Sequence, residues 1–132
     1  MHAEKALVDQ WALVASQYAN QNLMDVLLLE LAFPKGEDGQ VRMDRVQENL
    51  PAARAFLAII EAQLNQHSWL AGQHYSMADA LITPFLHYAA QAPVLDAEGK
   101  LIKQGTALAD YLERLRVRPS AVYLNHPDTQ SR

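Results

Sequence analysis

Five histidines are the first residues that could do chemistry in this chain, as metal ligands or as acid–base groups. His67 and His74 flank a predicted turn, and His87 falls in a predicted helix. A helical zinc site places two histidines four residues apart on one face, and no pair here has that spacing. We therefore expect no metal site and histidines that are exposed or packed in the core.

The other reactive residue types are no better arranged. The absence of cysteine excludes a thiol nucleophile and a thiolate metal site. The serines lack the glycine-flanked turn of a nucleophile elbow, and the chain has no glycine-rich phosphate loop. Asp25 and Glu30 are five residues apart in a predicted helix, so they do not share a face as an acid–base pair. The sequence predicts no catalytic constellation.

Length and composition indicate one globular domain. The 132 residues suffice for one domain, with 50% hydrophobic and 20% charged residues. The 11 basic and 15 acidic residues give a net charge of −4, and we expect neither nucleic acid nor an anionic membrane as a partner. The short basic run at 113–118 is predicted to offset a helix dipole. Without a signal peptide or a long apolar run, the prediction is a cytoplasmic protein.

Hydrophobic periodicity predicts a first helix over residues 3–33. Its first half carries one apolar stripe at Leu7, Trp11, Val14 and Tyr18. Its second half is apolar almost all the way round, with Asp25 and Glu30 as its only charges. Such a helix must be covered on more than one side. We expect the domain core on one side and a second subunit or a second domain on the other.

A second helix is predicted over residues 41–66, because apolar residues recur at alternating steps of four and three. This seam is expected to pack antiparallel against the first helix, and it consists of Val46, Leu50, Ala53, Leu57, Ile60 and Leu64. Pro51 cannot donate to the carbonyl of Gln47, so a kink or a restart is expected near Asn49.

The most informative local signal is the sequence Ser76-Met77-Ala78-Asp79. It predicts an N-cap in which Ser76 and Asp79 bond the first free backbone N–H groups of a buried central helix. Pro84 predicts a bend about one turn earlier. Further on, we expect a fourth helix over 106–116, a short fifth turn after Pro119 and a polar tail over 125–132. The stretch 94–102 could form a small hairpin.

Together these segments resemble the C-terminal, all-helical domain of glutathione transferases. The resemblance is sharpest over residues 69–80 (Trp-Leu-Ala-Gly-Gln-His-Tyr-Ser-Met-Ala-Asp-Ala), which is similar to the family's signature ahead of its central helix. Pro84, the segment 111–119 and the opening residues 4–11 are similar to further family positions. The resemblance covers about residues 3–124, which we take as the domain. It implies an all-α bundle of about five helices.

In that family, glutathione binds mainly to an N-terminal thioredoxin-like domain, which also supplies the thiol-activating residue. This sequence starts where such a domain would end, so the resemblance implies a chain that is inactive alone and needs no cofactor of its own. Glutathione would be the co-substrate of the full-length protein. The helical domain would give a wall of the electrophile pocket, here Trp11, Ala15 and Tyr18, and much of a homodimer interface.

Three functions therefore stay open. The first is the electrophile-binding and dimerisation half of a protein that conjugates glutathione to small hydrophobic electrophiles. The second is a non-catalytic protein–protein interaction module of the same fold, and the third is a stand-alone binder of hydrophobic ligands.

Overall fold

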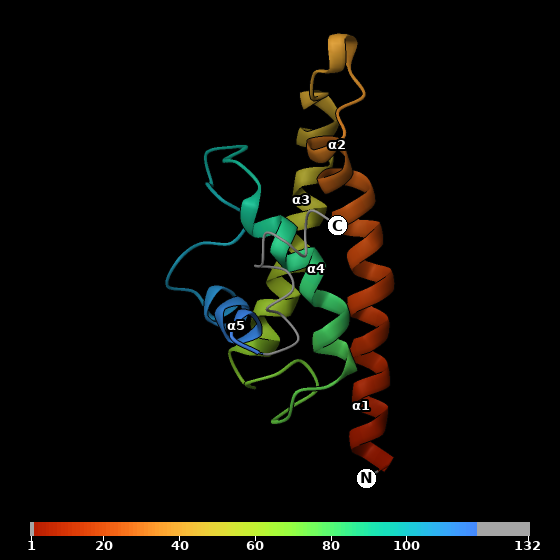
Figure 1. Ribbon diagram of the computed structural model, residues 1–132, viewed down its shortest axis with the longest axis vertical. Helices are drawn as coiled ribbons and strands as arrows, with labels where there is room; N and C mark the ends of the chain where they lie inside the picture. Colours follow the sequence, from red (N-terminus) through yellow and green to blue (C-terminus); the bar gives the residue numbers. More distant parts are fainter. Residues whose placement is uncertain (1, 119–132) are drawn as a thin grey trace.

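The computed structural model describes residues 2–118, and within that range the chain is helical with no β-strand (Figure 1). A single isolated bridge joins Trp69 and Gly72. This confirms the predicted all-α fold. The elements in chain order are α1 (His2–Leu13), η1 (Val14–Tyr18), η2 (Asn20–Leu28), α2 (Leu29–Ala32), η3 (Glu37–Gly39), α3 (Met43–Leu64), α4 (Met77–Gln91) and α5 (Ala107–Arg116).

The first four elements follow one another as a long helical rod along one side of the molecule (Figure 1). α4 is the central helix, because it packs against α1, η1, η2 and α5. α3 packs against η2 and also contacts α5. The rod and α4 therefore run side by side, and α5 lies on the far side of α4 from the rod (Figure 1).

The rod is helical as predicted, but its middle is π-helical rather than α-helical. At its end the amide of Leu29 bonds the carbonyl of Met24, five residues back. Four of the buried residues of this region, Ala15, Ala19, Leu23 and Leu27, each lie four residues after the last, and Leu28 is buried beside them. In an α-helix such a series drifts by about 40° per step. A π turn holds more residues and keeps the series on one face.

This buried series corrects the predicted stripe of the first half. Leu7 is 43% exposed and Tyr18 is 49% exposed, while Trp11 and Val14 are only half-buried against the core. The predicted stripe was based on large apolar side chains at α-helical spacing. The structure instead turns Ala15 and Ala19 inward, where their small side chains let the neighbouring helix approach closely.

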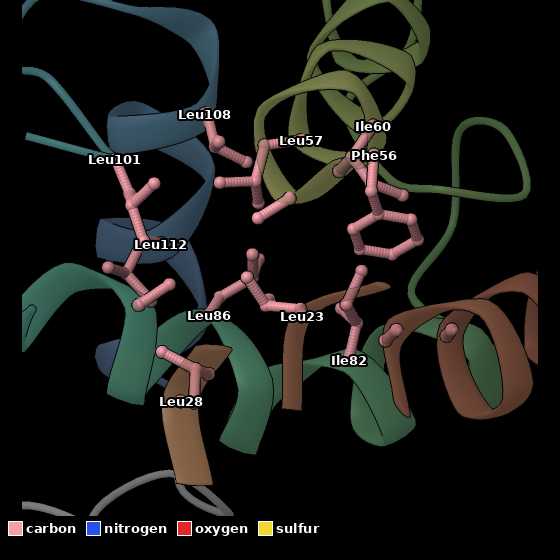
Figure 2. Packing of buried hydrophobic residues seen from close by; sticks show 14 of the residues in the cluster. Leu23, Leu28, Phe56, Leu57, Ile60, Ile82, Leu86, Leu101, Leu108 and Leu112 are labelled. Atoms are coloured by element: carbon pink, nitrogen blue, oxygen red, sulfur yellow. The ribbon is translucent and has the colours of Figure 1, made fainter. Parts of the chain in front are cut away.

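The predicted seam of the second helix is confirmed, because all six of its residues are buried in α3. Of the kink or restart expected near Asn49, the restart is wrong: α3 runs as one helix from Met43 to Leu64 with Pro51 inside it. The seam belongs to one buried cluster in which Leu57 lies near Leu108 of α5 and faces Leu23 of the rod and Leu86 of α4 (Figure 2).

α4 likewise continues through Pro84 as one helix. Its inner face is buried as predicted, at Ala78, Asp79, Ile82, Leu86 and Ala89. Its outer face is not covered, and Met77 is 63% exposed there. α5 begins at the N-cap Thr106, whose Oγ1 accepts a hydrogen bond from the amide of Ala109 at 3.2 Å.

Three sequence predictions fall outside the described residues: the turn after Pro119, the domain limit at residue 124 and the tail over 125–132. Among the helices that the structure does describe, none combines the length and the apolar character needed to cross a membrane.

Candidate ligand-binding groove

An apolar groove of about 520 Å³ lies where the end of the rod meets the C-terminal end of α4. Its volume falls in the range of small-molecule sites. Among the residues that the structure describes, no charged side chain lines it. The lining residues, which we call the end groove, are Met24, Leu28, Leu29, Leu31, Ala32, Phe33, Tyr88, Gln91, Ala92 and Pro93.

The end groove is open because two chain segments stop there together. The rod ends at Phe33, whose non-helical backbone (φ −131°, ψ 73°) breaks the helix. α4 ends at Ala92, which precedes Pro93 and turns away with ψ 141°. Phe33 is 67% exposed and Tyr88 is 52% exposed, so aromatic rings stand at the rim.

The polar groups at the groove are an amide and a phenol. Gln91 Nε2 lies 3.0 Å from Nε2 of His87, one turn back on α4. The pKa of His87 is lowered by its partial burial and by the charge of Arg116 on α5. His87 is therefore neutral at neutral pH, and its unprotonated ring nitrogen can accept a hydrogen bond from the Gln91 amide.

A buried ion pair holds the turn that follows the groove. Glu30, only 6% exposed, accepts hydrogen bonds from the amides of Lys35 and Arg42 at 3.1 and 3.3 Å. Its other oxygen accepts from Nε of Arg42 at 2.6 Å. The Arg42 guanidinium and these amides lower the pKa of Glu30 to about 2. The sequence predicts only that Glu30 does not pair with Asp25, and its bonds to Lys35 and Arg42 come from the structure.

The segment after the groove is fixed to α3, which corrects the predicted hairpin at 94–102. Arg54 donates to Asp96 Oδ1 at 2.6 Å and to the Gly99 carbonyl at 2.8 Å, and its Nε lies 3.2 Å from Glu98. Gln47 donates to the carbonyl of Leu95 at 2.9 Å. The polar groups of this loop face a guanidinium and an amide of α3 rather than a second strand.

The opposite end of α4 is built around a buried carboxylate. Ser76 and Asp79 form a capping box, in which Asp79 Oδ2 accepts from the Ser76 amide at 2.9 Å. Asp79 Oδ1 accepts from the Leu70 amide at 3.0 Å and from the hydroxyl of Tyr111 on α5. Burial and the Asp79 charge raise the pKa of Tyr111, which keeps its proton. Asp79 thus joins α4, α5 and the 69–72 turn, a wider role than an N-cap.

The basic run at the end of α5 packs on aromatic rings as well as lying at the negative end of the helix. Arg114 donates to the carbonyl of Ser68 at 2.7 Å and lies 5.6 Å from the rings of Trp69 and Tyr111. Arg118 lies 3.5 Å from the ring of Tyr75. These contacts fasten α5 to the loop ahead of α4.

The three residues expected to line an electrophile pocket do not lie in the end groove. Ala15 is fully buried in the core, which leaves it no surface for a ligand. Trp11 is half-buried against the core, and Tyr18 is half-exposed. The end groove begins at Met24, six residues further along the rod than Tyr18.

The described residues contain no group of three or more histidine, aspartate or glutamate side chains placed to hold a metal ion.

A family comparison decides the relationship that the fold and the signature segment suggest. The model of the glutathione S-transferase C-terminal domain matches residues 43–114, more than half of the chain. The chain belongs to this family. The match includes the signature segment, the capping box and Arg114 with the Trp69 and Tyr111 rings beside it.

Solved structures agree with this fold. Glutathione transferase F7 from Populus trichocarpa is 22% identical with a TM-score of 0.75, over 95% of this chain and 56% of that one. Poplar glutathione transferase F1 is 22% identical with a TM-score of 0.78, over 97% of this chain and 56% of that one. The chain therefore spans just over half the length of these proteins. A search of curated proteins finds no match.

Sequence reasoning missed the end groove because its residues come from two segments 55 or more residues apart. One signal did point to it: residues 23–33 are apolar on all sides, as if a further contact were needed. The structure covers this segment only in part, since Leu29 is 39% exposed.

Proposed function

We propose that this chain forms the electrophile-binding half of a glutathione transferase-like protein, with the end groove as one wall of the electrophile site. The observation that carries the proposal is an uncharged apolar groove of about 520 Å³ in a member of the glutathione S-transferase C-terminal domain family. Such a groove favours neutral hydrophobic ligands, because a charged ligand would lose its hydration without gaining a partner.

In this proposal the chain orients the electrophile and leaves thiol activation to a thioredoxin-like domain. The glutathione thiol adds across an activated double bond: an S–C bond forms, and the thiol proton moves to the neighbouring carbon. Holding the electrophile at a fixed angle to the thiol makes the step effectively unimolecular. The chain on its own is then expected to bind electrophiles and not to conjugate them.

Exposed apolar side chains support a further contact, as in a homodimer or with the thioredoxin-like domain. Leu7, Leu13 and Tyr18 on the rod are each more than two-fifths exposed, as is Met77 on α4. Large apolar side chains left exposed are typical of positions that an interface covers. We propose that one of these partners covers them in a protein of the cytoplasm.

The end groove also supports the simpler function of a hydrophobic ligand binder without catalysis. Both functions need the groove, and they differ in whether a thiol reaches the bound ligand. A pure interaction module needs no groove, so ligand binding separates it from the other two.

The test is displacement of the neutral dye Nile red from the chain by 2-methoxynaphthalene. Ala32→Trp places a large side chain in the groove and should weaken binding of both compounds at least tenfold. Ala52→Trp is the matched control, because Ala52 is exposed on α3 away from the groove, and it should leave binding unchanged. Equal effects of the two variants, or none, would overturn the proposal.

A further inference from the structure

The end groove contains two polar side chains, Gln91 and Tyr88, among ten lining residues. In an apolar site a single well-placed polar group fixes which ligands fit, because each unmatched polar group that is buried there costs free energy. The orientation of the Gln91 amide therefore matters. Its oxygen can only accept a hydrogen bond, and its nitrogen can only donate one.

His87 determines that orientation. The contact at 3.0 Å joins two nitrogens, Nε2 of Gln91 and Nε2 of His87. The amide nitrogen is a donor only, so the ring nitrogen must be unprotonated and accept. With the NH₂ group directed at His87, the amide oxygen of Gln91, a residue that lines the groove, takes no part in that contact.

The groups around His87 favour this arrangement. Arg116 of α5 acts on the ring with its positive charge and itself lies 3.7 Å from Glu113. On α4 the ring makes an edge contact with Tyr88, at 5.9 Å between centroids. A nearby cation disfavours the imidazolium form, which could not accept from Gln91.

We propose that Gln91, oriented by His87, makes the end groove selective for neutral aromatic ligands that carry a hydrogen-bond donor such as a hydroxyl or N–H group. This inference rests on the proposed function of the groove and names the ligand class within it. Gln91 is the specificity-determining residue, and His87 is a positioning residue that acts through it.

The test compares 2-naphthol, which has a hydroxyl donor, with 2-methoxynaphthalene, which has none. Each compound competes with Nile red for the chain at neutral pH. The readout is the affinity for 2-naphthol divided by the affinity for 2-methoxynaphthalene. Gln91→Leu should lower the ratio about fivefold, the value of one hydrogen bond of ordinary strength. Gln73→Leu is the control, because Gln73 is exposed in a loop outside the groove.

Two variants of the positioning residue test the orientation. His87→Glu can only accept, so it should keep the NH₂ group of Gln91 turned away from the groove and preserve the ratio. His87→Lys can only donate, so it should turn the amide oxygen toward itself and lower the ratio as Gln91→Leu does. If His87 had only a structural role, both variants would change the affinity ratio in the same direction.

The outcomes separate this inference from the proposed function. If both naphthalenes displace the dye and Ala32→Trp weakens them, but Gln91→Leu leaves the ratio unchanged, the selectivity is wrong and the groove stands. If Gln91→Leu lowers the ratio and His87→Lys does not, the positioning role is wrong. If neither compound displaces the dye, both proposals fall.

Discussion

The two ends of α4 differ in how they are packed. At its N-terminal end, Asp79 is fully buried and accepts from Leu70, Ser76 and Tyr111. At its C-terminal end, Gln91 borders a groove whose other walls are apolar and partly exposed. One end holds three segments together, and the other leaves space between two segments.

This difference assigns the fold-specifying contacts to the Asp79 end of α4 and the candidate ligand site to the Gln91 end. A buried carboxylate is tolerated only when several donors satisfy it, so the Asp79 end permits few changes. Exposed rim residues contribute little to folding, so the groove end can vary without loss of the fold. Substitutions at the Asp79 end should therefore cost more stability than substitutions at the groove end.

Asp79→Ala should have the largest effect on stability. It leaves the Leu70 and Ser76 amides and the Tyr111 hydroxyl buried without their acceptor, at a cost of about 3–5 kcal/mol of unfolding free energy. Urea denaturation followed by circular dichroism measures it. Tyr111→Phe removes one donor only and should cost about 1–2 kcal/mol. A cost for Asp79→Ala no larger than for Tyr111→Phe would contradict a joint role of the carboxylate.

Glu30→Gln should have an intermediate effect that depends on pH. The pKa of Glu30 lies near 2 in the folded chain, below its ordinary value of 4.5. Its stabilising contribution is therefore complete above pH 4.5 and is lost as pH falls from 4.5 toward 2.

The measurement is the urea midpoint of both chains between pH 6 and pH 2. The wild-type chain should be more stable at pH 6, and the gap should close as the pH approaches 2. A gap that stays constant across this range would show that the carboxylate charge is not what holds the 33–42 turn.

Phe33→Ala should have the smallest effect on folding. The side chain is 67% exposed, so the unfolding free energy should change by less than about 0.5 kcal/mol. The same change removes an aromatic wall of the groove and should weaken Nile red binding severalfold. Loss of stability comparable to Asp79→Ala would mean that the groove end is part of the fold's essential core.

Most of the fold could be predicted from the sequence, because the signals that specify it are local in the chain. The seam of α3 follows from apolar spacing, and the capping box follows from residue types at fixed offsets. The resemblance to the family is likewise sharpest over residues 69–80, which lie at the Asp79 end. Each of these signals is contained in one continuous segment.

The groove and the rod's register could not be predicted, because they depend on contacts between distant segments. Ala15 and Ala19 are inconspicuous in the sequence, yet they lie on the face of the rod that is fully buried. Burial of Asp79 against Tyr111 joins residues 32 positions apart. Pro51 predicted a kink or a restart, and α3 instead continues past it without a restart.

The most direct test of the central claim is an NMR titration of the chain labelled at its methionine methyl groups with 2-methoxynaphthalene. Met24 lines the end groove, whereas Met43 on α3 and Met77 at the start of α4 lie outside it and are exposed. We expect the Met24 methyl signal to shift in a saturable way while those of Met43 and Met77 stay in place. A saturable shift at Met77 with Met24 unchanged would place the ligand at the other end of α4 and contradict the account.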